Sequence, residues 1–147
     1  MTNELAAEMA TDCLASRVRR LERVVSRIYD GALRGTGMTA PQLSLLAAVE
    51  LVGPTTATFV GKLLDLEKST VSRNLARLAA LGLVETDGGL RITSRGSATI
   101  RECHPLWRRA QQQLREALGP RELELVAALE PIRPRRSSHG KRHNVRK

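Results

Sequence analysis

The chain has 147 residues, enough for one domain with a hydrophobic core or for a small domain with appendages. Its formal net charge is +9. Residues 133–147 carry seven Lys or Arg residues and no acidic residue. The remaining residues, 1–132, contain 17 basic and 15 acidic residues and so have a net charge of +2. The body of the protein is therefore close to neutral, and we expect the basic tail to be disordered and to attract polyanions without specificity.

Aromatic residues are limited to Tyr29, Phe59 and Trp107, which argues against the stacking platforms of proteins that bind single-stranded nucleic acid. Cys13 and Cys103 lie ninety residues apart without a CxxC pair, so neither a zinc site nor a disulfide framework is indicated. No apolar run approaches the length of a membrane span and no signal peptide is visible. We therefore expect a cytoplasmic protein that does not bind membranes.

The first predicted helix runs from residue 12 to residue 33, with Asp12 or Thr11 as its N-cap. Its apolar residues recur at alternating spacings of four and three and form a heptad-like stripe: Leu14, Val18, Leu21, Val25, Ile28 and Ala32. Such a stripe belongs either to the core of one subunit or to an interface between subunits, and the sequence leaves both interpretations open.

Two helices are predicted next. Thr39 and Gln42 form a capping-box pattern that opens the first of them. Thr55 or Thr56 caps the second, which is short and has Gly61 at its centre. A glycine there is unfavourable for the helix itself, so it indicates that another helix backbone passes close by.

A third helix follows after only residues 66–68, with Ser69 as its N-cap. Two short helices joined by so tight a turn are typical of a helix-turn-helix. Residues 83–86 and 90–93 then flank Asp-Gly-Gly at 87–89, a turn sequence between two short strands. A helix-turn-helix followed directly by a hairpin predicts a winged helix.

The C-terminal part begins with a long helix capped by Thr93 or Ser94, and Pro105 predicts a kink or break near residues 103–104. Residues 119–120 (Gly-Pro) end it and start a last amphipathic helix. The apolar stripes of the helices outside the winged core have no evident partner of their own, so pairing with a second copy of the chain is the simplest solution.

The predicted fold is therefore mainly α with a small β-hairpin wing, a winged helix-turn-helix with N- and C-terminal dimerisation helices. The expected division places the N-terminal dimerisation helix in residues 1–37 and the winged helix-turn-helix that binds DNA in residues 38–96. Residues 97–132 would hold the C-terminal dimerisation helices, and residues 133–147 are the basic tail.

The helix after the tight turn has two different faces. Val71, Leu75, Leu78 and Ala79 fall on one stripe, and Thr70, Arg73, Ala76, Arg77 and Ala80 cover the opposite side. The second face is either simply solvated or suited to a DNA major groove. Arginine pairs bidentately with guanine, so Arg73 and Arg77 are the first candidates for base contacts.

The neighbouring polar residues have more general candidate roles. Thr70 and Ser72 lie in the first turn, where a helix N-terminus favours phosphate. Asn74 either reads adenine or steadies the turn, and Lys62 and Lys68 are candidate phosphate contacts, which position a protein without reading sequence.

The order of elements resembles the MarR family of bacterial transcription regulators over residues 12–130. The resemblance rests on six motifs in order: Tyr29-Asp30, the box at 39–42, Ser-Thr-Val-Ser-Arg-Asn-Leu at 69–75, Leu-Gly-Leu-Val at 81–84, Ile-Thr-Ser-Arg-Gly at 92–96 and Pro-Leu-Trp at 105–107. It implies a homodimer that binds a palindromic operator on double-stranded DNA, usually as a repressor. It also implies release by a small phenolic or lipophilic effector or by cysteine oxidation, and DNA-facing positions at Ser69, Thr70, Ser72, Arg73, Asn74 and Arg77.

The resemblance has one departure and two further implications. The family's basic wing tip is replaced here by a short, acidic tip, which leaves Arg91 as a candidate backbone contact. An effector cavity between the dimer helices and the winged core could be lined by Arg23 or Tyr29. Cys13 is a redox candidate because a helix N-terminus lowers a thiol pKa, although a buried, inert thiol is the alternative for both cysteines.

No grouping typical of an enzyme, a metal site or a cofactor site stands out, so we expect no catalytic residues and no cofactor. Two alternatives to a sequence-specific regulator remain. One is a winged-helix protein-interaction module with weak DNA affinity, and the other is non-specific nucleic-acid binding through the basic tail.

Overall fold

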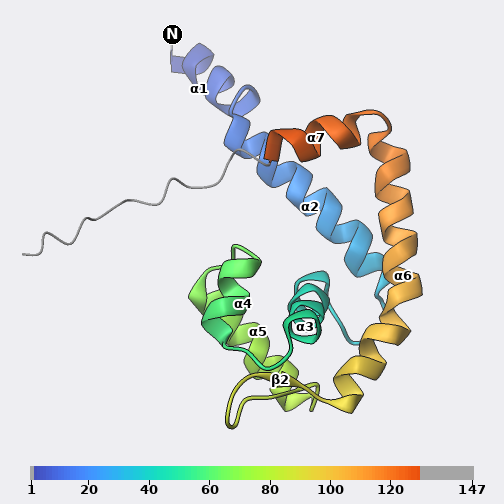
Figure 1. The fold of residues 1–147 in the computed structure, drawn as a ribbon. Coiled ribbons are helices and arrows are strands. Elements are labelled where there is room, and N and C mark those ends of the chain that lie inside the picture. Colours follow the sequence, from blue (N-terminus) through green and yellow to red (C-terminus); the bar gives the residue numbers. More distant parts are fainter. Residues whose placement is uncertain (1, 130–147) are drawn as a thin grey trace, which may run out of the picture. The chain divides into compact units, whose positions relative to one another are not determined.

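The structure is a computed structural model, and it describes residues 2–129. Its elements in chain order are α1 (Thr2–Thr11), α2 (Leu14–Ala32), α3 (Ala40–Val52), α4 (Ala57–Leu63), α5 (Lys68–Ala80), β1 (Val84–Glu85), β2 (Arg91–Ile92), α6 (Ser94–Leu118) and α7 (Arg121–Leu129). The fold is mainly α with a small hairpin, as predicted (Figure 1). The predicted tail at residues 133–147 lies outside the described residues. Among residues 2–129, no helix combines the length and the apolar character that crossing a membrane would require.

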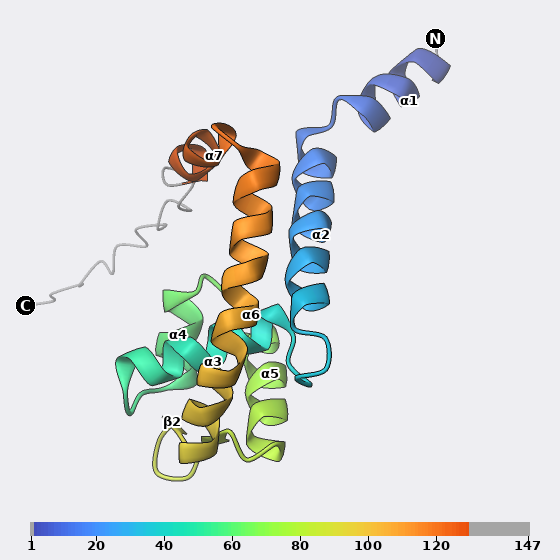
Figure 2. The ribbon, with the colours of Figure 1, turned by 90° about the vertical axis from the view of Figure 1, so that its right-hand side faces the viewer.

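The core of the winged domain lies between α3, α4 and α5, which stay together in both views, with the hairpin at one end (Figures 1 and 2). Its fully buried side chains include Leu45, Leu46, Val49, Val60 and Leu78. Gly61 of α4 is also buried, and a Cβ there would lie 3.1 Å from Val71 Cγ2 of α5. The predicted close approach of a neighbouring helix at this glycine is therefore confirmed, and it allows the tight turn between α4 and α5.

Capping interactions set the starts of three helices. Thr39 and Gln42 form the predicted capping box of α3, in which Thr39 N donates to Gln42 Oε1 at 3.1 Å. Thr56 accepts from Phe59 N at 3.1 Å and so caps α4. The Thr93 hydroxyl accepts from Gly96 N at 3.0 Å at the start of α6. These bonds satisfy backbone N–H groups that have no partner within the helix.

The wing is a two-stranded antiparallel hairpin in which Val84 pairs with Ile92 and Glu85 pairs with Arg91. Gly88 and Gly89 have φ values of 73° and 117°, which favour glycine at the tip. Thr55, just before α4, forms a bridge with Leu90 through two backbone hydrogen bonds of 3.0 Å each. This bridge, which the sequence did not reveal, fastens the hairpin to the helix-turn-helix.

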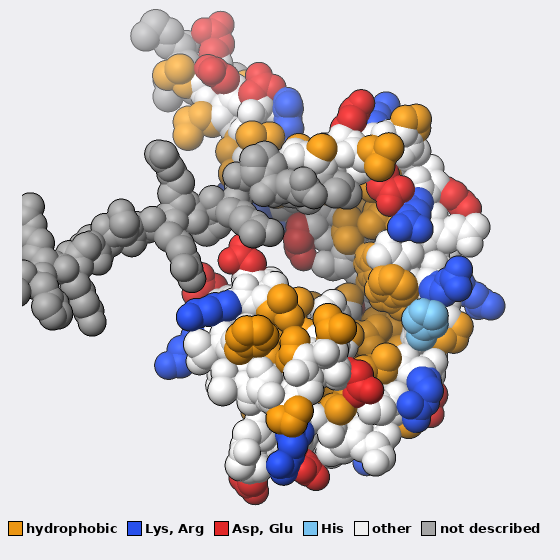
Figure 3. All heavy atoms as spheres, in the orientation of Figure 1, with side chains coloured by type: hydrophobic (Ala, Val, Ile, Leu, Met, Phe, Trp, Pro, Cys, Tyr) orange, Lys and Arg blue, Asp and Glu red, His pale blue; other side chains and the backbone are white. Residues whose placement is uncertain are grey.

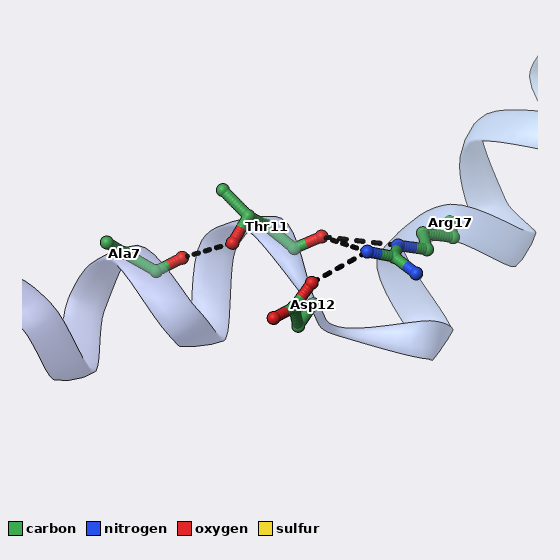
Figure 4. A network of polar contacts seen from close by, with 4 residues as sticks. All are labelled: Ala7, Thr11, Asp12 and Arg17. Carbon is green, nitrogen blue, oxygen red and sulfur yellow. Dashed lines mark hydrogen bonds and ion pairs between the residues drawn. The ribbon is translucent and has the colours of Figure 1, made fainter.

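The structure corrects the predicted N-terminal boundary. Thr2–Thr11, for which no helix was predicted, form α1, and α2 begins after Cys13 instead of being capped by Asp12 or Thr11. Both polar side chains have other partners, because the Thr11 hydroxyl donates to Ala7 O at 2.8 Å and Asp12 Oδ1 lies 2.7 Å from Arg17 Nη2 (Figure 4). The N-cap position of α2 is occupied by Cys13, without a capping hydrogen bond from a side chain.

The predicted N-cap of α5 is wrong: it is Glu67 and not Ser69, so Ser69 lies in the first turn of the helix. Of the kink or break predicted near residues 103–104, the break is absent, because helix α6 continues through Pro105. Proline removes one N–H bond from the ladder, and this loss is offset because Cys103 and Ala110, on either side of it, are fully buried.

The described residues divide into two compact units, and the second begins at Arg115, within α6. In this second unit α6 ends at Leu118 and α7 starts at Arg121, which confirms the predicted stop and restart at residues 119–120. Arg115 Nε and Glu122 Oε1 lie 2.9 Å apart across this turn.

Candidate nucleic-acid interface

Helix α5 buries one side and exposes the other. Val71, Leu75 and Leu78 are buried, with Leu78 completely inaccessible, so the predicted apolar stripe is confirmed. Ser69, Ser72, Arg73 and Arg77 are exposed. The hydrophobic effect fixes the orientation of the helix, since burying leucine and valine side chains stabilises the fold by about 1.5–3 kcal/mol each. The polar face is turned outward as a consequence.

The two arginines of this face make no polar side-chain contact within the described part of the chain. Among residues 2–129, no ion pair or side-chain hydrogen bond was found for Arg73 or Arg77. They lie four residues apart, so both guanidinium groups project from neighbouring turns of the same exposed side. An exposed pair of unpaired guanidinium groups is available to an external anion or to a base edge.

The other candidate residues of α5 are arranged around these arginines. Lys68 and Ser69 are exposed in the first turn and Thr70 is half-buried. Asn74 is half-buried, and its Nδ2 donates to Thr70 O at 3.0 Å. The Asn74 amide is thus bonded within its own helix, and it steadies the first turns of α5 in this state.

A groove lies beside α5, between it and α4. Its volume is about 610 Å³, and Lys62 and Lys68 line it together with hydroxyl-bearing residues of three different segments, Thr58, Ser72 and Thr86. Sequence reasoning missed Thr58 and Thr86, because single threonines on separate elements give no periodic signal. Ammonium and hydroxyl groups around an apolar floor supply hydrogen-bond donors for an anion.

The wing arginine is bonded within the hairpin. Arg91 Nη2 lies 3.3 Å from Glu85 Oε2 and donates to Asp87 O at 3.4 Å. Both side chains of the ion pair are about half exposed, so the pair is weak and can be exchanged for another partner. The hairpin pairing of Glu85 with Arg91 places the two opposite each other.

Two cavities lie next to the winged core. One, of about 550 Å³, is lined by residues of α2, α3 and α6 that include Ser26, Tyr29, Pro41, Trp107 and Gln111. Tyr29 lines this cavity, whereas Arg23 is exposed and is not among its lining residues. The other, of about 610 Å³, lies between α3, α4 and α6. Hydrophobic side chains gather over α4 and alongside α6 (Figure 3).

The Trp107 side chain lines both cavities. It stacks with His104, their ring centroids lying 6.0 Å apart. Volumes of this size are typical of small-molecule sites, which are mostly apolar with a few polar groups. Ser44, which also lines both cavities, supplies such a group.

The two cysteines have different environments. Cys103 is completely buried as expected, and this burial raises the pKa of its thiol. Cys13 is half-exposed at the N-cap of α2, so the expectation of a buried thiol is wrong for this residue. A hydrogen bond with the Ser16 hydroxyl, followed by bonds to backbone N–H groups, lowers the pKa of the Cys13 thiol.

Comparison with known proteins identifies relatives over most of the chain. A model of the MarR family matches residues 36–91. The transcriptional regulator MosR of Mycobacterium tuberculosis shares 30% sequence identity, covering 81% of this chain and 93% of its own, with a TM-score of 0.70. No curated protein sequence gives a match.

Two further solved structures have the same fold at lower identity. A mutant of Escherichia coli MarR complexed with operator DNA is 23% identical, with a TM-score of 0.74 over 86% of this chain and 98% of its own. The transcriptional repressor CouR bound to p-coumaroyl-CoA is 20% identical, with a TM-score of 0.71 over 83% of this chain and 91% of its own. The winged helix-turn-helix, the matched family model and the similarity to MosR agree, and the chain belongs to the MarR family of transcriptional regulators.

Proposed function

We propose that the protein is a homodimeric repressor that binds a palindromic operator through α5 and is released by a small ligand. The observation that carries this proposal is the exposed face of Arg73 and Arg77, which have no partner among the described residues, on a helix whose opposite stripe is buried in the winged core. The operator complex of a MarR structure with the same fold supports it.

In this proposal α5 lies in the major groove, and Arg73 and Arg77 read guanine through N7 and O6. Each bidentate contact of this kind is worth about 1–3 kcal/mol of discrimination against the wrong base. Thr70 and Ser72 add hydroxyl donors near the start of the helix, where the helix dipole also favours phosphate.

Contacts to the phosphate backbone would position α5 without reading sequence. Lys62, Lys68 and Thr58 line the groove between α4 and α5, so one DNA strand passing along it would meet two ammonium groups and a hydroxyl. On the wing, Arg91 would exchange its partner Glu85 for a phosphate when DNA is bound.

A small lipophilic or phenolic molecule is the proposed effector, and the cavity lined by Tyr29 and Trp107 is its proposed site. A ligand there would contact α2, α3 and α6 together, and α3 packs directly on α5 in the core. CouR, whose structure contains p-coumaroyl-CoA, supports a ligand-responsive regulator. Release through oxidation of Cys13 is the secondary proposal, and it rests on the half-exposed position of that thiol.

A protein-interaction module with weak DNA affinity is the alternative favoured by a specific observation. The hairpin has an acidic tip, and its one arginine is bonded to Glu85 and Asp87 O instead of projecting freely. Non-specific binding through residues 133–147 is the other alternative, because those residues carry only positive charge.

Selection of bound sequences from random DNA duplexes separates these functions. For the proposed repressor, the wild type should enrich one palindromic sequence, Arg73→Ala should relax the preference at defined positions, and deletion of residues 133–147 should leave the preference intact. If the deletion removes most binding while Arg73→Ala has little effect, the tail binds DNA non-specifically. If the wild type retains no duplex even at low salt, the interaction module is the correct function.

A further inference from the structure

The proposed effector cavity between α2, α3 and α6 contains polar groups but no cation from the described part of the chain. Its polar lining consists of the side chains of Ser26, Tyr29, Ser44 and Gln111, which are all uncharged at neutral pH. The other side chains that line it are apolar, as in most small-molecule sites. A ligand in this cavity would therefore find hydrogen-bond partners and an apolar surface, but no positive charge.

The arginines that are closest in sequence to the lining residues point elsewhere. Arg23 and Arg27 of α2 are exposed and do not line the cavity. Arg27 Nε donates to Arg23 O at 3.2 Å, which holds the Arg27 side chain along its own helix. Arg108 follows Trp107 on α6, and it is also exposed and outside the lining. Among residues 2–129, a negative charge inside the cavity would thus have no cation beside it.

The charged groups that are bonded to the lining residues are acidic. The Ser26 hydroxyl of α2 donates to Glu22 Oε1 at 2.7 Å. Ala40, a lining residue of α3, donates its backbone N–H to Asp30 Oδ1 at 3.0 Å. Two carboxylates therefore lie next to the cavity, one bonded to each of two walls. A carboxylate on the ligand would be repelled by both of them.

Ser26 can offer a ligand only a hydrogen-bond acceptor while it is bonded to Glu22. A serine hydroxyl has one proton and two lone pairs, and the proton of Ser26 is used in the bond to Glu22. A ligand hydroxyl that donates to Ser26 Oγ would extend this chain of hydrogen bonds, and the bonds of such a chain polarise and strengthen one another. An ether or an ionised carboxylate has no proton to donate to Ser26.

We propose that the effector cavity selects an uncharged aromatic molecule with a hydroxyl donor and rejects aromatic carboxylates. The ring packs on the apolar lining beside Trp107, and the hydroxyl donates to Ser26 Oγ. Rejection follows because moving an ionised carboxylate from water into a cavity without a cation is costly. The inference rests on the proposed effector site, and it adds the chemical class of the ligand and the residue that recognises it.

Three small probes that differ in one group test this selectivity. Para-cresol has the ring and the hydroxyl, para-hydroxybenzoate carries a carboxylate in place of the methyl group, and para-methylanisole cannot donate. Trp107 is the only tryptophan of the chain, so its indole N–H signal in the NMR spectrum of the isotope-labelled full chain reports binding. At neutral pH the Kd of para-cresol should be lower than that of para-hydroxybenzoate by about tenfold and lower than that of para-methylanisole by about fivefold.

Two variants separate the acceptor from the missing charge. Ser26→Ala should weaken para-cresol binding about fivefold and leave para-methylanisole binding unchanged, because it removes only the acceptor. Ser97→Ala is the matched control, since Ser97 Oγ also donates to a glutamate, Glu50 Oε2 at 2.8 Å, but lies outside the cavity lining. Gln111→Arg supplies a cation and should tighten para-hydroxybenzoate binding about tenfold. Circular dichroism checks the folding of each variant.

The proposed selectivity is overturned if the wild type binds para-hydroxybenzoate as tightly as para-cresol, or if no probe shifts the indole signal. Equal losses of para-cresol and para-methylanisole binding in Ser26→Ala overturn the role of Ser26. The titrations contain no DNA, so they do not depend on operator binding. If they fail while the wild type still enriches one palindromic duplex, the proposed DNA-binding function stands. If the wild type enriches no duplex, that function fails, whatever the probes show.

Discussion

At the scale of single residues, the proposed DNA interface contains two kinds of side chain, those without a partner and those already bonded. Arg73 and Arg77 are unpaired among the described residues, so they can bind DNA without first breaking a bond. Arg91 is already bonded to Glu85, and Asn74 to its own helix. Residues of the second kind must exchange a partner on binding, which reduces their net contribution to affinity.

Glu85→Gln should therefore tighten DNA binding. The substitution removes the carboxylate that holds Arg91 and also removes a negative charge from the wing. Exposed ion pairs are worth about 0–1 kcal/mol, so we expect affinity for the selected duplex to rise about two- to fivefold. Fluorescence anisotropy at two salt concentrations measures it. Glu22→Gln, an equal change in charge on α2, should have little effect. Unchanged or weaker binding by Glu85→Gln would show that the wing does not approach the DNA.

Cys13 should react with iodoacetamide faster than Cys103 in the folded protein. The Ser16 hydrogen bond lowers the pKa of Cys13, so a larger fraction is thiolate at neutral pH, whereas Cys103 is buried and its pKa is raised. The pH at which alkylation of Cys13 reaches half its maximum rate should lie higher in Ser16→Ala than in the wild type. Mass spectrometry of quenched samples measures both rates. Equal rates for the two cysteines contradict the prediction.

At the scale of elements, the winged domain depends on close contacts between backbone segments. The hairpin is bonded to the residue before α4 through Thr55 and Leu90. It also packs on the first turn of α6, where a Cβ at Gly96 would overlap Leu83 O and lie 2.7 Å from Ile92 Cγ1. The wing position is thus determined by glycine and by main-chain bonds more than by side-chain burial.

Gly96→Ala should destabilise the fold. The added methyl group has no space against a backbone oxygen, so the hairpin or α6 must shift, and overpacking of this kind typically costs about 1–3 kcal/mol. Urea unfolding followed by circular dichroism measures the loss in the free energy of unfolding. Gly31→Ala is the matched control, because a Cβ there meets no atom within 4 Å, and it should be neutral or slightly stabilising. A wild-type midpoint for Gly96→Ala is incompatible with the packing described.

At the scale of the whole molecule, the proposed dimer presents two copies of α5 to one face of the DNA. Two-fold symmetry requires a palindromic site, because each copy reads the same half-site in the opposite direction. The arginine face of α5 and the lysines of the adjacent groove together supply positive charge for the phosphates.

We expect selected sites to contain half-sites separated centre to centre by about one helical turn, ~34 Å, or by a multiple of it.

Affinity for DNA should fall steeply as the salt concentration rises, because phosphate contacts release counterions. Lys62→Ala should reduce the slope of this salt dependence by about one unit without changing the preferred sequence. Footprinting of the selected duplex and a salt titration test these points. A single, asymmetric half-site contradicts the dimeric arrangement.

The sequence alone determined the order and type of most elements. The apolar stripe of α5, the capping box of α3, the glycine of α4 and the turn of the hairpin are local patterns, and each depends on residues within a few positions of one another. They are sufficient to predict a winged helix-turn-helix and to place Arg73 and Arg77 on the side of α5 opposite its buried stripe.

Only the tertiary structure decided which side chains are free. Three findings depend on contacts between separate elements or on burial. Arg91 is bonded to Glu85, Thr58 and Thr86 share a groove with two lysines, and α6 continues through Pro105. Helix α1 was missed because its ten residues have weak periodicity, and its junction is held by Arg17, a residue of the next helix. Periodicity records which face of an element is buried, whereas the partners of polar groups are set by packing across the chain.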